Sequence, residues 1–172
     1  MVSNNAVDDI IEKAIFSEDA EVKKYNLEQI RRMASAAGIY LASIQGLYEA
    51  AAKGAYARKT VPAINIRGLT YLTARTIFKS ALKHKVGAFI FEIARTEIAY
   101  TNQSPDEYVT SVLAAAIKER FSGPVFVQGD HFQLNQKKYT ADPRAEVKSV
   151  EDSTREAIAA GFLNIDIDSS TL

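Results

Sequence analysis

Four short apolar runs, separated by stretches of helical character, constrain the fold of this chain most. They are residues 61–66, 86–93, 124–129 and 162–167. Strands that alternate with helices favour an α/β fold with a parallel sheet and right-handed crossovers. Ligands and catalytic groups gather at the carboxyl ends of such strands, so the polar residues there are the first candidates for a site.

The stretches between the runs carry start and stop signals for helices. Ser104 precedes Pro105 and Glu107, the pattern of an N-cap with a capping box. Asp142 before a proline predicts another helix start, and Gly161 predicts the end of that helix just before the last run. The sequence therefore predicts helices between the strands.

The first third of the chain has the apolar spacing of helices instead of strands. Residues 5–54 are predicted to be helical, with breaks at Gly38 and Gly54. In this interpretation residues 1–54 form a helical extension that packs on a second unit, residues 55–172, which contains the sheet.

The number of strands is compatible with two architectures. Four parallel strands can form a small open sheet covered by helices, or the first half of a (β/α)8 TIM barrel. Residues 164–172 end directly after a strand, where a barrel would place active-site residues and begin its next helix. We therefore expect a TIM barrel of which this chain carries about the first four β/α units, truncated relative to the working protein.

Charge and composition exclude several classes of function. The 21 basic residues balance the 21 acidic ones and are dispersed, so neither a nucleic-acid partner nor a membrane partner is expected. Because the chain has no cysteine, any metal must be held by nitrogen and oxygen ligands. No signal peptide or membrane-length run is evident, so we expect a cytoplasmic protein. A lone Gly68 after the first strand argues against a dinucleotide-binding loop.

An acid and an imidazole, Asp130 and His131, follow the third run. Consecutive side chains of a regular strand point to opposite faces, so we expect both residues to lie past the regular end of the strand. In the fourth run we expect Asp168 to face the site and Asp166 to point away from it. The alternative is that the acid caps a turn and the histidine is structural.

Taken together, these segments resemble the class II, metal-dependent fructose-bisphosphate aldolases. Residues 61–66, Val-Pro-Ala-Ile-Asn-Ile, resemble the first barrel strand of that family, and Asp130-His131 resembles its aspartate-histidine pair. Residues 161–170 resemble its fourth strand, and the likeness covers roughly residues 43–172. The resemblance implies a zinc-dependent lyase that reversibly cleaves a ketose bisphosphate, such as fructose 1,6-bisphosphate, into dihydroxyacetone phosphate and an aldehyde phosphate.

The resemblance also assigns roles to individual residues. It implies that His131 is a metal ligand and that Asp130 transfers the proton of the hydroxyl at the cleaved bond. Asn65 and Asp168 match a substrate-contacting asparagine and an aspartate near the metal, so both are expected at the substrate, together with Glu92 of the second strand. The metal is expected to be Zn²⁺ or another divalent ion.

The second strand departs from the family pattern. Many members carry a glutamine and then a serine that polarises the aldehyde, whereas this chain has Glu92, Ile93 and Ala94. Polarisation of the aldehyde is then expected to depend on Glu92, Arg95 or Thr96. From the residues alone, Glu92 is equally well explained as an ion-pair partner of Arg67 or Arg95, and Asn65 as a turn former.

Further expectations concern the whole protein. A phosphorylated ketose is the expected partner, and the full-length form is expected to be a homo-oligomer. The chain alone is expected to bind metal poorly and to show no aldolase activity. The alternatives are a non-catalytic small α/β module or divergent barrel that binds a sugar phosphate, and a dimer of two half-barrels.

Overall fold

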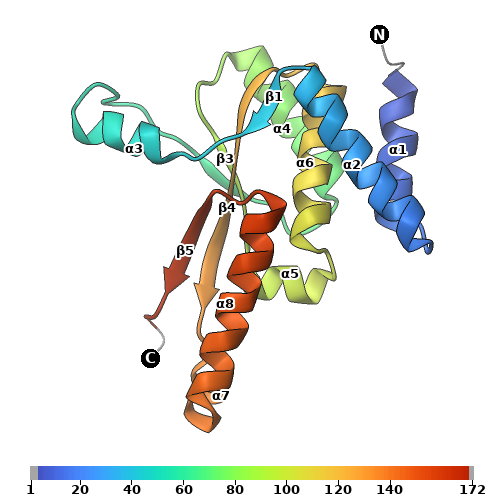
Figure 1. Cartoon of the computed structure of the whole chain (residues 1–172). Helices are drawn as coiled ribbons and strands as arrows, with labels where there is room; N and C mark the ends of the chain where they lie inside the picture. The colour runs from blue at the N-terminus through green and yellow to red at the C-terminus, as the bar shows by residue number, and fades with distance from the viewer. Residues whose placement is uncertain (1–3, 171–172) are drawn as a thin grey trace.

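The computed structural model describes residues 4–170 and shows an α/β fold around one parallel sheet (Figure 1). Its strands are β1 (Ile39–Leu41), β2 (Ala63–Asn65), β3 (Ile90–Ala94), β4 (Gly123–Gln133) and β5 (Asn164–Asp168). Strands β2, β3, β4 and β5 lie side by side in that order, and every pair is parallel. The predicted order and direction of the four apolar runs are therefore confirmed.

Helices connect the strands and cover the sheet. They are α1 (Asn4–Phe16), α2 (Ala20–Ala36), α3 (Gln45–Ala52), α4 (Thr70–His84), α5 (Arg95–Thr101), α6 (Pro105–Lys118), α7 (Gln136–Ala141) and α8 (Pro143–Ala160). Between residues 4 and 170, none of them combines the length and the apolar character that crossing a membrane requires.

The predicted helix signals are confirmed by the geometry of the helix ends. The Ser104 hydroxyl accepts a hydrogen bond from the Glu107 amide, and the Glu107 carboxylate accepts one from the Ser104 amide. The Asp142 carboxylate accepts a hydrogen bond from the Ala145 amide at the start of α8. Gly161 ends α8 with φ of 106°, a conformation that other residues rarely adopt.

One strand was not predicted. Residues 5–54 are not helical throughout, because β1 lies between α2 and α3 and pairs with the start of β4. The Gly123 amide donates to the Gly38 carbonyl at 2.9 Å, and the Ala42 amide donates to the Val125 carbonyl at 3.1 Å. A strand of three residues is too short to show an alternating pattern, which explains the wrong prediction. Through β1 the first helices are joined directly to the sheet.

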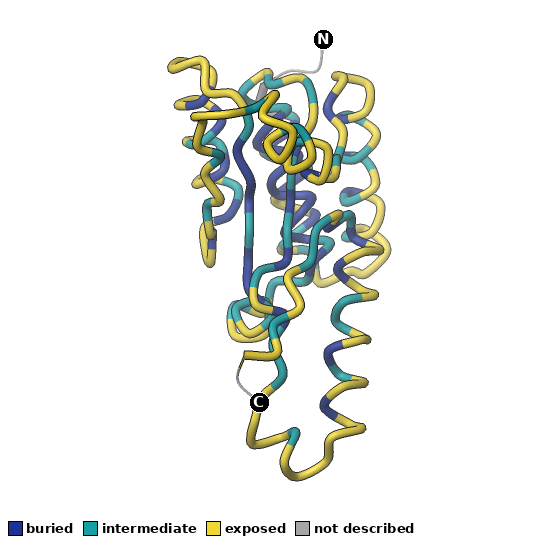
Figure 2. The backbone as a smooth tube through the Cα atoms, turned by 90° about the vertical axis from the view of Figure 1, so that its left-hand side faces the viewer, coloured by how far each residue is buried: buried dark blue, intermediate teal, exposed yellow. Residues whose placement is uncertain are grey.

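The sheet has two unlike faces. Phe91, Ile93, Val125 and Val127 are buried and belong to the same core as residues of α4 and α6 (Figure 2). The residues that alternate with them along β4 are only half-buried, as period-two alternation dictates when helices cover one face. The polar side chains of the strand ends therefore lie on the open face.

Helix α1 is held to α4 and α6 by the carboxylate of Asp8. Its Oδ1 accepts a hydrogen bond from the Tyr71 hydroxyl, and its Oδ2 accepts one from the Lys118 ammonium, both at 2.6 Å. Burial raises the pKa of Asp8, but the hydrogen bonds from Lys118 and Tyr71 lower it by more, so this pKa lies below its ordinary value of 3.8. The ionised carboxylate is therefore the form that the folded state favours.

We expect Asp8→Asn to lower the free energy of unfolding by about 1 kcal/mol at pH 7. A carboxyl whose pKa is depressed by folding stabilises the protein above its unfolded pKa and loses this contribution as the pH falls through its folded pKa. The difference between parent and variant should therefore shrink below about pH 4. Urea unfolding at pH 7 and pH 3 measures it, with the exposed Asp152→Asn as control. A difference of equal size at both pH values would contradict this role of Asp8.

Candidate functional site

The candidate site is built around an irregularity of β4. Between Gly129 and Phe132, β4 contains one residue more than β5, so Asp130 and His131 together lie opposite the single residue Asp166. His131 has φ of 46°, in the left-handed region that residues other than glycine seldom occupy. These are the features of a β-bulge, which re-aims side chains within a strand.

The bulge places Asp130 and His131 on the same face of the sheet. The expectation that both lie past the end of the strand is wrong, because β4 continues to Gln133. The extra residue shifts the alternation, so that Phe132 is buried while its predecessor His131 is exposed. Two adjacent side chains can therefore serve one site from within a strand.

The two acids of β5 also share this face. The prediction that Asp166 points away from Asp168 is wrong, because residues two apart on a strand lie on the same side. Asp166 Oδ2 lies 3.8 Å from His131 Nδ1, and Asp168 Oδ2 lies 3.4 Å from the same nitrogen. Sequence analysis chose one acid where the structure brings two together, and the period of the strand was the signal that could have shown it.

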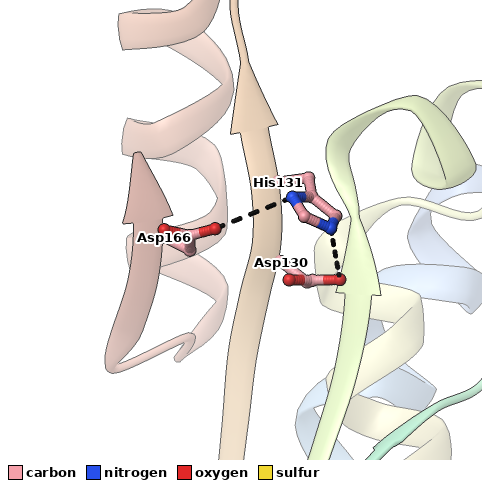
Figure 3. Close-up of side chains that lie close together, drawn as sticks. All are labelled: Asp130, His131 and Asp166. Carbon is pink, nitrogen blue, oxygen red and sulfur yellow. Dashed lines mark ion pairs between the residues drawn. The ribbon is translucent and has the colours of Figure 1, made fainter. Parts of the chain in front are cut away.

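The imidazole of His131 stands between carboxylates from two strands (Figure 3). Its Nε2 lies 3.6 Å from Asp130 Oδ2, on the side opposite to Asp166. One donor atom from each of Asp130, His131 and Asp166 lies within 4.8 Å of the others, which is close enough for the three residues to hold one metal ion. A nitrogen and two carboxylate oxygens are donors that zinc and other divalent ions accept.

Asp168 is held by two hydrogen-bond donors, and its Oδ2 also lies 3.4 Å from His131 Nδ1. Gln133 Nε2 donates to its Oδ2, and the Ser170 amide donates to its Oδ1, both at 2.8 Å. Hydrogen bonds from Ser170, and after them the proximity of His131, hold the pKa of Asp168 below its usual range. Asp168 is therefore an oriented, ionised carboxylate, whereas Asp166 is more exposed.

Glu92 lies on the neighbouring strand β3 and belongs to the same face. Its Oε2 accepts a hydrogen bond from Gln128 Nε2 at 2.7 Å. Burial raises the pKa of Glu92 and the charge of Asp130 adds to this, while the hydrogen bond from Gln128 opposes it. The pKa of Glu92 therefore lies above its usual range, and the hydrogen bond from Gln128 fixes the position of its carboxyl group.

The interpretation of Glu92 as an ion-pair partner of Arg67 or Arg95 is wrong. Arg67 Nε lies 3.6 Å from Glu97, and Arg95 is paired with Glu146. Arg95 is also not available to polarise an aldehyde, because its guanidinium is directed toward α8.

Asn65, at the end of β2, is in register with Glu92 and extends the site by one strand. Its Nδ2 donates to Glu97 Oε2 at 2.6 Å, and the same oxygen accepts a hydrogen bond from the Ala94 amide at 2.9 Å. Glu97 was missed by sequence analysis, because nothing in the sequence shows that α5 returns to the end of β2. The hydrogen bond to the Glu97 carboxylate uses the Nδ2 of Asn65 and does not involve the amide oxygen of Asn65.

Two cavities lie among the residues that the structure describes. One of about 810 Å³ is formed by residues of α1, α4 and α6, among them Ile11, Leu72 and Ser111. A smaller one, of about 260 Å³, is formed by the start of α5, the end of β4 and α8, and it includes Arg95 and Thr96. Asn65, Glu92, Asp130, His131 and Asp168 line neither of them. The candidate site is an open sheet edge.

Comparisons of the chain with protein-family models, curated proteins and solved structures found no match.

Proposed function

We propose that this chain belongs to a zinc-dependent aldolase and that β2 to β5 are the first four strands of its (β/α)8 barrel. The proposed reaction is the reversible cleavage of a ketose bisphosphate, such as fructose 1,6-bisphosphate, into dihydroxyacetone phosphate and an aldehyde phosphate. The observation that carries the proposal is the convergence of Asp130, His131 and Asp166 at the carboxyl ends of parallel strands. The likeness of Asp130-His131 to the aspartate-histidine pair of class II aldolases supplies the type of reaction.

The residues present suit a divalent ion and suggest a division of roles. On the Nδ1 side of His131, Asp166 offers an exposed carboxylate, while the oxygens of Asp168 already accept hydrogen bonds. His131 and Asp166 would therefore hold the ion, with positions left open for substrate, as catalytic zinc sites require. On the Nε2 side Asp130 keeps its carboxylate for proton transfer.

A bound divalent ion would stabilise the negative charge that develops on the ketose carbonyl oxygen during cleavage. Asp130 accepts the proton of the hydroxyl whose carbon becomes the aldehyde, and returns it in the reverse reaction. Glu92, whose pKa is raised by burial, lies on the same face in β3 and is placed to bind a substrate hydroxyl.

The other residues of the edge bind the sugar or position the imidazole. Asn65 Nδ2 is engaged by Glu97, so its amide oxygen is the atom left to accept a hydrogen bond from a substrate hydroxyl. Asp168, fixed by Gln133, lies beside the imidazole and orients it. The residues of the site come from four strands, β2 to β5, which is the kind of arrangement that barrel enzymes use.

We expect His131→Ala to abolish saturable zinc binding in the protein as its gene encodes it, because the variant loses the nitrogen ligand of the site. The chain has one other histidine, His84 at the end of α4, so His84→Ala is a matched control that should bind zinc as the parent does. Isothermal titration with Zn²⁺ and metal analysis after dialysis measure both.

Unchanged zinc occupancy in His131→Ala would contradict the assignment of the ligand. Zinc binding by the parent without any cleavage of fructose 1,6-bisphosphate would contradict the aldolase and favour a non-catalytic α/β module that binds a sugar phosphate.

A further inference from the structure

We infer that Arg95 is a positioning residue of the site: it fixes the end of β4 and, through Gln133 and Asp168, the orientation of the His131 imidazole. Arg95 lies directly after β3, as the first residue of α5. What the oriented imidazole does rests on the proposed function, whereas the orientation itself does not.

The guanidinium of Arg95 joins three elements. Its Nε donates to Ser153 Oγ at 3.1 Å and its Nη2 to Ser149 Oγ at 2.6 Å, both on α8. Its Nη1 donates to the backbone carbonyl of Gln133 at 3.1 Å and to Glu146 Oε1 at 3.3 Å. Nitrogens pointing in fixed directions thus hold α8 and the last residue of β4 at once, which the planar fork of an arginine allows.

Glu146 completes a clamp on the chain after β4. The same Oε1 that faces Arg95 accepts a hydrogen bond from the Asn135 amide at 2.9 Å. This backbone hydrogen bond, and then Arg95, keep the pKa of Glu146 below its usual range. The pair therefore holds the carbonyl of Gln133 and the amide of Asn135, the two backbone groups that flank Leu134.

The pair of Arg95 and Glu146 is largely buried, and it contributes more to the local geometry than to stability. The side chains of Arg95 and Glu146 are 16% and 3% exposed. Burying two charges costs desolvation energy that their attraction seldom exceeds, so such a pair is weak as a source of stability. Its hydrogen bonds do, however, fix the backbone on which Gln133 stands.

A continuous series of contacts leads from this clamp to the imidazole. Gln133 is in register with Asp168 across the sheet and donates to its Oδ2 at 2.8 Å, and this same oxygen lies 3.4 Å from His131 Nδ1. Strand pairing on both sides of the bulge constrains the left-handed conformation of His131. Arg95 secures the side that follows the bulge.

The test replaces the whole pair so that no buried charge is left alone. In Arg95→Met with Glu146→Gln, the carbonyl of Gln133 loses its donor. The matched control is Arg75→Met with Glu119→Gln, which removes a pair joined at 2.8 Å between α4 and the end of α6. Circular dichroism and urea unfolding establish that both double variants are folded.

The decisive readout is the imidazole itself. The 172-residue chain has two histidines, so its ¹H–¹³C spectrum of the Cε1–H groups at one pH contains one signal from His131 and one from His84. We expect the Arg95 double variant to shift or broaden the His131 signal and to leave that of His84 unchanged, and the control to move neither. A folded Arg95 double variant with an unmoved His131 signal would overturn the inference.

Two further measurements keep the result interpretable. Arg95→Lys retains the charge but cannot reach Gln133 and both serines at once, so we expect it to displace the His131 signal in the same way. This variant replaces the double variant in the test if the double variant does not fold. In the loaded protein, the Arg95 double variant should bind zinc about 10- to 100-fold more weakly. If the parent binds no zinc, the proposed function fails, and the spectrum still decides the role of Arg95.

Discussion

Replacing Asp130 by asparagine is expected to slow the cleavage of fructose 1,6-bisphosphate by about 100- to 10,000-fold, the usual contribution of a positioned acid-base group. Asparagine keeps the shape of the side chain but cannot accept the proton. Asp130 lies 3.6 Å from His131 on the side of the ring away from Asp166, so zinc content should be retained. The rate is measured with saturating zinc on the protein as its gene encodes it.

Asp152→Asn is the matched control, since it makes the same chemical change in an exposed pair with Lys148 on α8. It should cleave at the parental rate. If Asp130→Asn also cleaves at that rate, the proton-transfer role is refuted. If it loses its zinc along with its activity, Asp130 is a ligand, and the division of roles on the two sides of His131 is wrong.

Replacing Phe132 by alanine is expected to lower the free energy of unfolding by about 3–5 kcal/mol, the range for deleting a buried aromatic ring. Phe132 is fully buried and directly follows the bulge. Its ring lies over Gly129, where a Cβ atom would stand 2.4 Å from Phe132 Cε2 and 2.9 Å from Ile165 Cδ1. The ring thus fills the space that a side chain at residue 129 would need, and its loss leaves a cavity beneath the bulge.

Urea unfolding followed by circular dichroism measures this loss. Phe16→Ala is the control, because the same truncation is made at a side chain that is 78% exposed. It should change the free energy of unfolding by less than about 0.5 kcal/mol. Equal losses in the two variants would show that the ring of Phe132 does not anchor β4.

The local signals of this sequence predicted most of the fold. The N-caps at Ser104 and Asp142 and the C-cap at Gly161 were predicted correctly because capping depends on residues within one helical turn. Strand order followed from short connections and right-handed crossovers. Strand β1 escaped prediction because its three residues gain their structure from β4, more than 80 residues later.

The geometry of the candidate site could not be predicted from the sequence. Asp130 and His131 were expected past the end of their strand, whereas they form a bulge within β4, and nothing local indicates that a histidine adopts a left-handed conformation. Whether Asp166 faces the site was decidable from the period of a strand and was judged wrongly. The direction of Arg95 could not be predicted, because it depends on how α8 packs against the end of β4.

Strand β4 is paired along both edges: β3 lies beside it through Asp130, and β1 and then β5 lie along the other side. The histidine therefore belongs to a paired strand and not to a loop, directly after the last residue of β4 that β3 reaches. Segments that open and close on a microsecond timescale are usually loops with few backbone hydrogen bonds. Any segment that opens and closes over this site is therefore expected among the connections that follow the strands, while the imidazole keeps its position.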